Sequence, residues 1–205
     1  MIEQTLDITT AAGQMETFIC RPERGAAFPA VLLLMDAPGI REELRDMARR
    51  LGTVGYYVVL PNLYYRAGRD MIFGPDVLEE GSADRERMRA IRTKMTIPPV
   101  MDDIAAMLAF ADRQSEVKRG PAGCHGYCMR GRYPWLRQLA TRTASPPLRL
   151  RDWLVSDAEK SPHTLAGQRS EELCIACAEY DALAPLPMVK ELRTLFDRAG
   201  TAGGD

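Results

Sequence analysis

The sequence has no long apolar segment. Its longest uncharged apolar run, residues 28–35, is far shorter than the ~20 residues that a helix needs to cross a bilayer. Residues 1–4 do not form the basic segment, followed by an apolar one, with which a secretion signal begins. We therefore expect neither a membrane anchor nor an export signal.

An excess of charge of either sign is also absent. The chain has 27 basic and 28 acidic residues and a net charge of −1, so no strong field attracts nucleic acid or an anionic membrane. Arginines cluster over residues 132–151, but no recognisable nucleic-acid-binding motif accompanies them. The 5 cysteines, an odd number without an export signal, indicate reduced thiols and a cytoplasmic protein.

Segments typical of strands and helices alternate along the 205 residues. We expect strands over residues 3–9, 14–20, 29–35, 56–60, 121–127 and 173–178. We expect helices over residues 40–53, 83–94, 99–113 and 187–199. This alternation predicts one α/β domain, residues 1–205, with a mostly parallel sheet that carries helices on both faces.

Residues 126–131 (GYCMRG) have the pattern of a nucleophile elbow, a sharp turn between a strand and a helix. Gly126 stands two places before Cys128, as the crowding of such a turn requires, and the thiol would be the nucleophile. Arg130 departs from the pattern, since the elbow usually has glycine at that place. The alternative is that Cys128 is a small buried hydrophobic residue, the commoner role of a cysteine after an apolar strand.

Four segments, in this order, resemble the dienelactone hydrolases, cysteine-nucleophile members of the α/β-hydrolase fold. They are residues 31–39 (VLLLMDAPG), 55–64 (GYYVVLPNLY), 126–129 (GYCM) and 178–185 (AEYDALAP). The resemblance covers nearly the whole chain outside residues 132–153. It implies an α/β-hydrolase-type sheet and hydrolysis of a small ester or enol-lactone, without a metal or another cofactor.

The resemblance also implies roles for individual residues. Cys128 matches the nucleophile, and Asp181 matches the acid that orients a catalytic histidine. The backbone amides of Ala37 and Met129 match the oxyanion hole, which stabilises the negative charge that develops on the attacked carbonyl. Asp36 stands where the family often has an acidic residue near the resting thiol.

The histidine of the triad is missing from the place that the family pattern gives it. In this fold the order is nucleophile, acid, histidine, yet His125 and His163 both precede Asp181. We expect the last strand, the histidine loop and the closing helix to be absent, the activity to be impaired, and the exposed sheet edge to favour self-association. The alternative is a non-catalytic or vestigial hydrolase-like binding protein.

Three further groups of residues leave alternatives open. Cys174 and Cys177 form a Cys-x-x-Cys motif, but residues three apart in a strand face opposite sides, so a buried strand is favoured over a redox or zinc site. Residues 64–66 (YYR) could line a substrate pocket or cover the sheet. The arginines of residues 85–92 could bind a substrate carboxylate, although a solvated helix face is favoured.

Overall fold

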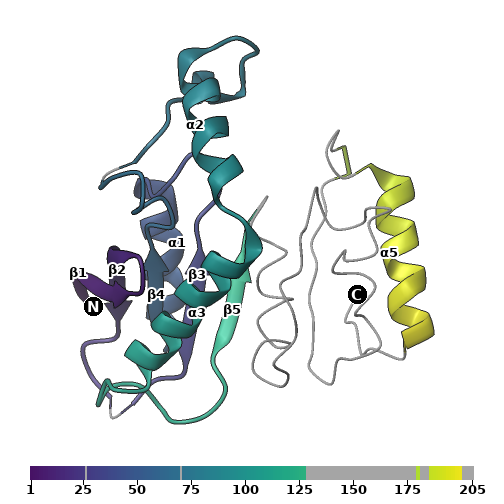
Figure 1. The fold of residues 1–205 in the computed structure, drawn as a ribbon. Helices are drawn as coiled ribbons and strands as arrows, with labels where there is room; N and C mark the ends of the chain where they lie inside the picture. The colour runs from purple at the N-terminus through teal and green to yellow at the C-terminus, as the bar shows by residue number, and fades with distance from the viewer. Residues whose placement is uncertain (26, 70, 128–178, 181–184, 200–205) are drawn as a thin grey trace. The chain divides into compact units, whose positions relative to one another are not determined.

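The chain divides into two compact units, Met1–Arg130 and Gly131–Asp205. The structure, a computed structural model, describes residues 1–25, 27–69, 71–127, 179–180 and 185–199 (Figure 1). Most of the described residues belong to the first unit, which contains a five-stranded sheet. That residues 1–205 form a single domain stays a prediction.

The chain begins with an antiparallel hairpin. Strands β1 (Ile2–Thr10) and β2 (Gly13–Arg21) pair in continuous register, from Ile2 opposite Arg21 to Thr10 opposite Gly13. Gly13 closes the turn at φ 129°, a backbone conformation that a residue with a side chain rarely adopts. The hairpin predicted from residues 3–9 and 14–20 is confirmed.

Three further strands of the described residues belong to the same sheet: β3 (Ala30–Leu34), β4 (Tyr57–Pro61) and β5 (Gly123–Gly126). The spatial order is β1-β2-β4-β3-β5. The pairing of β2 with β4 is antiparallel, whereas β3 is parallel to both β4 and β5. Every residue of β3 and β4 is buried, as the two continuous apolar runs in the sequence predict.

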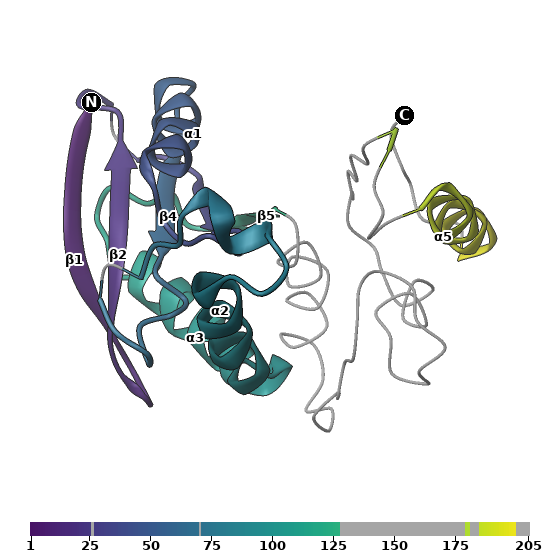
Figure 2. The same cartoon turned by 90° about the horizontal axis from the view of Figure 1, so that it is seen from above.

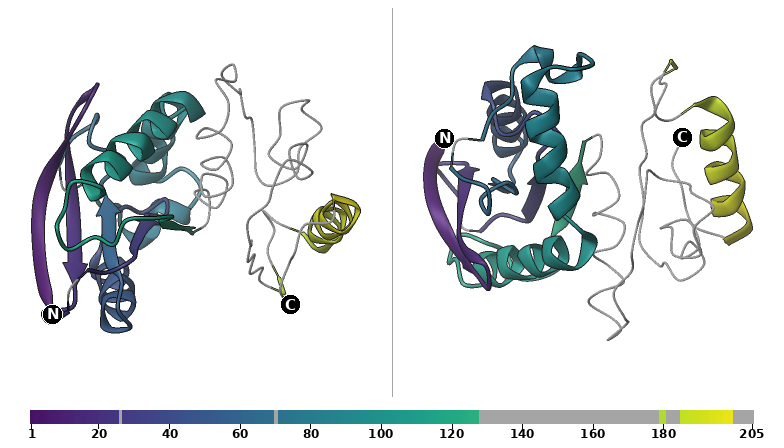
Figure 3. Two further views of the ribbon diagram at one scale, coloured as in Figure 1. Left: turned by 90° about the horizontal axis from the view of Figure 1, so that it is seen from below. Right: turned by 45° about the horizontal axis from the view of Figure 1, so that its top comes forward.

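Helices cover both faces of this sheet. Figures 2 and 3 show α1 (Glu42–Thr53) on one face and α3 (Ile97–Ala111) on the opposite face. Helix α2 (Ala83–Lys94) precedes α3, and a short 3-10 helix, η1 (Pro75–Leu78), lies in the loop between β4 and α2. The predicted α/β architecture with two covered faces is confirmed.

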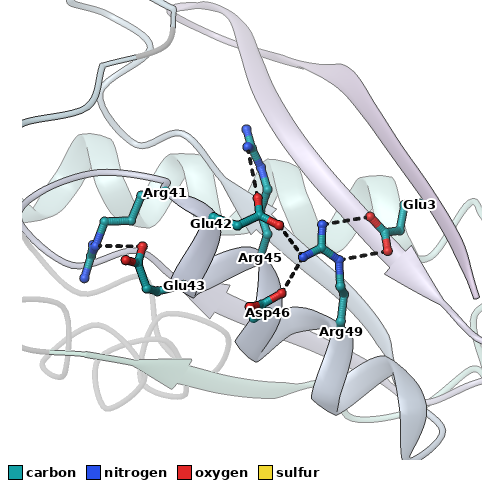
Figure 4. A network of polar contacts seen from close by, with 7 residues as sticks. All are labelled: Glu3, Arg41, Glu42, Glu43, Arg45, Asp46 and Arg49. Atoms are coloured by element: carbon teal, nitrogen blue, oxygen red, sulfur yellow. Dashed lines mark hydrogen bonds and ion pairs between the residues drawn. The ribbon is translucent and has the colours of Figure 1, made fainter.

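Helix α1 is held to the sheet by burial and by charge. Leu44 and Ala48 are buried on one side of the helix. On its outer side Arg49 donates through Nε to a carboxylate oxygen of Glu3 on β1, at 2.9 Å, and also bonds to Glu42 (Figure 4). The helix begins two residues later than residues 40–53 predict, because Arg41 is the extended N-cap residue.

The second unit contains α5 (Leu186–Ala199), which the sequence predicts over residues 187–199. Leu192 of this helix is buried. The predicted strand over residues 173–178 and the atypical segment 132–153 lie outside the described residues. No helix in the described part of the chain is both long and apolar enough to cross a membrane.

Candidate active site

Two adjacent strands lead to the same edge of the sheet. Strands β3 and β5 are parallel neighbours, with Leu34 opposite Gly126. Parallel neighbours lie about 4.8 Å apart and end at the same edge. In the sequence Ala37 follows Leu34 by three residues and Cys128 follows Gly126 by two, so both segments continue from this edge.

The loop after β3 is bound through its carbonyl groups. The buried Tyr64 hydroxyl donates to the carbonyl oxygen of Ala37 at 2.8 Å. The backbone N–H of Phe73 donates to the next carbonyl, that of Pro38, at 2.9 Å. Two successive carbonyls are therefore held by the chain that follows β4, and Ala37 is only 8% exposed.

Gly39 allows the loop to approach that chain closely. Its φ is +93°, and a Cβ at this position would overlap the backbone carbonyl of Met71. Its N–H donates to the carbonyl oxygen of Asp36 at 3.4 Å, which closes a tight turn. Only glycine satisfies both the left-handed conformation and the contact.

Asp36 forms a two-point ion pair with Arg41. The two guanidinium nitrogens of Arg41 lie 2.6 and 2.8 Å from the two carboxylate oxygens of Asp36. This hydrogen bonding to Asp36 raises the pKa of Arg41. The Asp36 side chain is 17% exposed and the Arg41 side chain 31%. The expected position of Asp36 beside the Cys128 thiol stays a prediction, because Cys128 lies outside the described residues.

Of the two predicted donors of the oxyanion hole, only the main-chain N–H of Ala37 lies in the part of the chain that the structure describes. Among the described residues, no acceptor is found for this N–H. Buried N–H groups are almost always paired, with protein, water or a ligand. The role of the Ala37 amide as an oxyanion donor stays a prediction. The second expected donor, Met129, lies outside the described residues.

Both tyrosines of the 64–66 segment bind other parts of the protein. Tyr64 binds the Ala37 carbonyl, and its ring packs edge-on against Phe73 with centroids 5.9 Å apart. The Tyr65 hydroxyl donates to Asp103 on α3 at 2.8 Å and also lies 2.7 Å from the Thr10 hydroxyl. These contacts join the segment to the β3 loop, to α3 and to the end of β1, and they leave both alternatives for residues 64–66 open.

The contact between Tyr64 and the β3 loop was not predicted from the sequence. The two residues stand 27 positions apart, and no periodic pattern connects them. The only signal was indirect, namely that both belong to segments that resemble the same family. Arg41 was likewise missed, because in the sequence it is one of several charged residues on an amphipathic helix.

The end of β5 carries one of the two histidines. His125 packs edge-on against Tyr127, with ring centroids 4.5 Å apart, and burial lowers its pKa. Arg87 of α2 lies with its guanidinium 5.8 Å from the centroid of the Phe73 ring.

The expected nucleophile and acid, Cys128 and Asp181, lie outside the described residues, as do the cysteines of the Cys-x-x-Cys motif and His163. The described residues contain no group of three or more potential metal ligands.

Sequence comparison connects this arrangement to known proteins. The sequence model described as the dienelactone hydrolase family matches residues 15–200. A relative from Methylorubrum extorquens, named "Putative carboxymethylenebutenolidase", is 28% identical over 136 residues, which are 66% of this chain and 44% of the relative. A protein of the same name from Salmonella typhi is 27% identical over 135 residues, or 63% and 45% of the two chains. The chain spans about half the length of the curated relatives it matches.

Comparison of the structures supports the same fold. A crystal structure from Klebsiella pneumoniae, named "Putative Dienelactone Hydrolase", superposes with a TM-score of 0.77 at 20% identity. The match covers 98% of this chain and 82% of that one. At this identity the likeness establishes the α/β-hydrolase fold alone, whereas the sequence match extends over most of the chain. The chain belongs to the dienelactone hydrolase family.

Proposed function

We propose that this chain is a hydrolase of the dienelactone hydrolase type, which cleaves a small ester or enol-lactone through an acyl-enzyme on Cys128. The observation that carries the proposal is the pairing of β3 with β5, with Leu34 opposite Gly126. This pairing directs the Ala37 amide and the segment that leads to Cys128 to one edge of the sheet. The proposed oxyanion hole consists of the main-chain N–H groups of Ala37 and Met129.

In the first step the Cys128 thiolate attacks the carbonyl carbon of the ester. A carbon–sulfur bond forms and the carbonyl π electrons move to oxygen, where the two N–H groups stabilise the charge. The carbonyl then re-forms, the bond to the leaving oxygen breaks, and the alkoxide or enolate departs and takes a proton from water, to which the thiol had earlier lost its own. The product is a thioester of Cys128, and no redox partner or metal takes part in the step.

In the second step water must attack the thioester carbonyl and lose a proton, the carbon–sulfur bond breaks, and the acid and the Cys128 thiolate are released. In the family pattern a histidine after Asp181 accepts that proton, with Asp181 orienting its ring. His125 and His163 both precede Asp181 in these 205 residues. We propose that the polypeptide 1–205 is acylated by an ester with a good leaving group but releases the acyl group slowly. We propose the same substrate class, a small ester or enol-lactone, for the whole protein.

Turnover of p-nitrophenyl acetate tests this function. Because p-nitrophenolate departs without needing a proton, we expect one equivalent to be released in a burst, followed by slow turnover. A Cys128→Ala variant should lack the burst, and mass spectrometry should locate one acetyl group on the Cys128 peptide of the unsubstituted chain. Equal release by both proteins would contradict the proposal and favour the alternative, a non-catalytic hydrolase-like binding protein.

We also propose that the protein works in a reducing compartment, the cytoplasm. The odd number of cysteines, 5 in the chain, supports this location. A reactive cysteine nucleophile also needs to stay reduced, because a thiolate is readily oxidised. Fractionation of the source cells, with the protein detected by an antibody, tests the location; recovery outside the cytoplasm would contradict it.

A further inference from the structure

We propose that Tyr64 is a positioning residue for the oxyanion hole, and that its hydroxyl acts by fixing the peptide group that follows the Ala37 amide. The inference rests on the proposed function, because it assigns Tyr64 a role in the acylation of Cys128. It goes further by naming a side chain whose hydroxyl would affect acyl transfer without contacting the substrate.

Tyr64 is itself firmly placed. It belongs to a turn directly after β4, where the Asn62 side chain accepts a hydrogen bond from the Tyr64 N–H at 2.9 Å. The Asn62 amide nitrogen donates in turn to the carbonyl of Gly68 at 3.2 Å. Tyr64 is 1% exposed, so its ring has little freedom to move. The hydroxyl is thus a fixed donor for the Ala37 carbonyl.

The contacts around Ala37 lie on both sides of its amide. Before it in the sequence, Asp36 is held by the two-point pair with Arg41. After it, the carbonyls of Ala37 and Pro38 accept from the Tyr64 hydroxyl and the Phe73 N–H. An amide whose neighbours are bound in this way keeps its direction when charge develops in front of it, which is the condition for an effective oxyanion hole.

Among these contacts, only the Tyr64 hydroxyl can be removed cleanly. A Tyr64→Phe variant keeps the ring that packs against Phe73 and deletes one oxygen atom. It leaves the buried carbonyl of Ala37 without this donor, so the loop can shift to find another. A displacement of about 1 Å in a catalytic group can reduce a rate about a hundredfold. Tyr64→Phe should therefore lower the rate of reactions that generate an oxyanion.

Two reactions of the same thiol separate positioning from general damage. Acetylation by p-nitrophenyl acetate passes through an oxyanion, whereas alkylation by iodoacetamide displaces iodide directly and forms none. Both are followed as rate constants for the Cys128 peptide by mass spectrometry, in the full chain. Tyr65→Phe is the matched control, because it removes a neighbouring buried hydroxyl that binds Thr10 and Asp103 instead of the β3 loop.

We expect Tyr64→Phe to slow acetylation about ten- to a hundredfold and to change alkylation less than about twofold. Tyr65→Phe should change both rates less than about twofold, whatever its effect on thermal stability. The inference is overturned if acetylation by Tyr64→Phe stays within twofold of the unsubstituted chain, if both reactions slow equally, or if Tyr65→Phe slows acetylation as much. If the unsubstituted chain is alkylated but not acetylated at Cys128, the proposed function itself fails, and this inference with it.

Discussion

The guanidinium of Arg66 binds both carboxylate oxygens of Asp103, at 2.7 and 2.9 Å, although the Asp103 side chain is only 1% exposed. Asp103 also accepts from the Tyr65 hydroxyl, which lies 2.7 Å from the hydroxyl of Thr10. The Arg66 guanidinium lies over the Tyr65 ring, 4.5 Å from its centroid. These side chains join α3, the loop after β4 and the first hairpin around one buried carboxylate.

Removal of Arg66 should therefore destabilise the protein strongly. An Arg66→Ala variant leaves the Asp103 carboxylate buried without its opposite charge, and breaking a buried pair in this way costs about 3–5 kcal/mol. We expect the free energy of unfolding, measured by urea denaturation, to fall by that amount. The matched control is Arg45→Ala, because Arg45 pairs with Glu42, whose side chain is 62% exposed.

Exposed ion pairs are worth about 0–1 kcal/mol, so the control should change the free energy of unfolding by no more than that. An equal fall in the free energy of unfolding in the two variants would show that the burial of Asp103 does not determine how much stability is lost. A loss of activity in Arg66→Ala without a loss of stability would instead give Arg66 a role near the substrate.

The contact between Arg66 and Asp103 is an example of what the sequence could not predict, whereas several helices and strands could be predicted. The residue pattern within a segment was enough to predict some helices. Helix α2 spans the residues 83–94 that its pattern predicts, and the Ser82 side chain caps its first turn. Strands β3 and β4 followed from uninterrupted apolar runs. Contacts between residues far apart in the chain carry no local signal, which is why neither the ion pair of Asp103 nor the hydrogen bond of Tyr64 to Ala37 is predicted from the sequence.

The errors at element boundaries have similar physical causes. Helix α3 begins at Ile97 and not at the predicted residue 99, because Pro98 and Pro99 occupy the first helical turn, where an N–H has no partner within the helix. The 3-10 helix Pro75–Leu78 lies in a segment for which the sequence predicts neither a strand nor a helix. For the candidate site, the resemblance pointed to Ala37, but only the structure revealed the contacts that hold it.

Gly39 offers a second test, on the loop that carries Ala37. In a Gly39→Ala variant the new Cβ would meet the Met71 carbonyl, so the loop must move away from the chain between β4 and η1 or unfold locally. Gly55→Ala is the matched control, since Gly55 has a similar φ of +104° but nothing within 4 Å of the added carbon. The control isolates the cost of the backbone conformation, about 1–2 kcal/mol.

We expect Gly39→Ala to cost at least about 2 kcal/mol more than Gly55→Ala in the free energy of unfolding, because overlap with backbone atoms adds to the conformational strain. Acetylation of Cys128 by p-nitrophenyl acetate should fall in Gly39→Ala and stay unchanged in Gly55→Ala. Indistinguishable unfolding curves for the two variants would mean that the close approach to Met71 is not present in solution.

Cys20 provides a prediction for the pH dependence of stability. Burial raises the pKa of this thiol from 9.0 to about 11, with a smaller contribution from the Glu3 carboxylate, partly opposed by Arg49. Between these two values the unfolded chain loses the proton while the folded chain keeps it. Stability from this group is therefore complete below pH 9 and is lost as the pH rises toward 11.

The slope from one such group is at most about 1.4 kcal/mol per pH unit. Urea denaturation of the unsubstituted chain and of Cys20→Ala, each at pH 8 and pH 10.5, measures it. We expect the unsubstituted chain to lose more stability over this interval than the variant, whatever the variant's own deficit at pH 8. At pH 8, iodoacetamide should label Cys20 only after unfolding; rapid labelling of the native protein would contradict the assigned burial.

The absence of a histidine after Asp181 in these 205 residues leads to a prediction of chemical rescue. If the acetyl group stalls on Cys128 because no base activates water, free imidazole should supply that base. After removal of excess p-nitrophenyl acetate by gel filtration, imidazole at tens of millimolar should accelerate loss of the acetyl group from the Cys128 peptide.

Only neutral imidazole accepts a proton, so the acceleration should rise with pH through a pKa near the histidine value of about 6.5 and then level off. An Asp181→Asn variant should show less rescue, because its side chain cannot stabilise the imidazolium that forms. An acetyl group that decays at the same rate with and without imidazole would mean that a missing base is not what limits the second step.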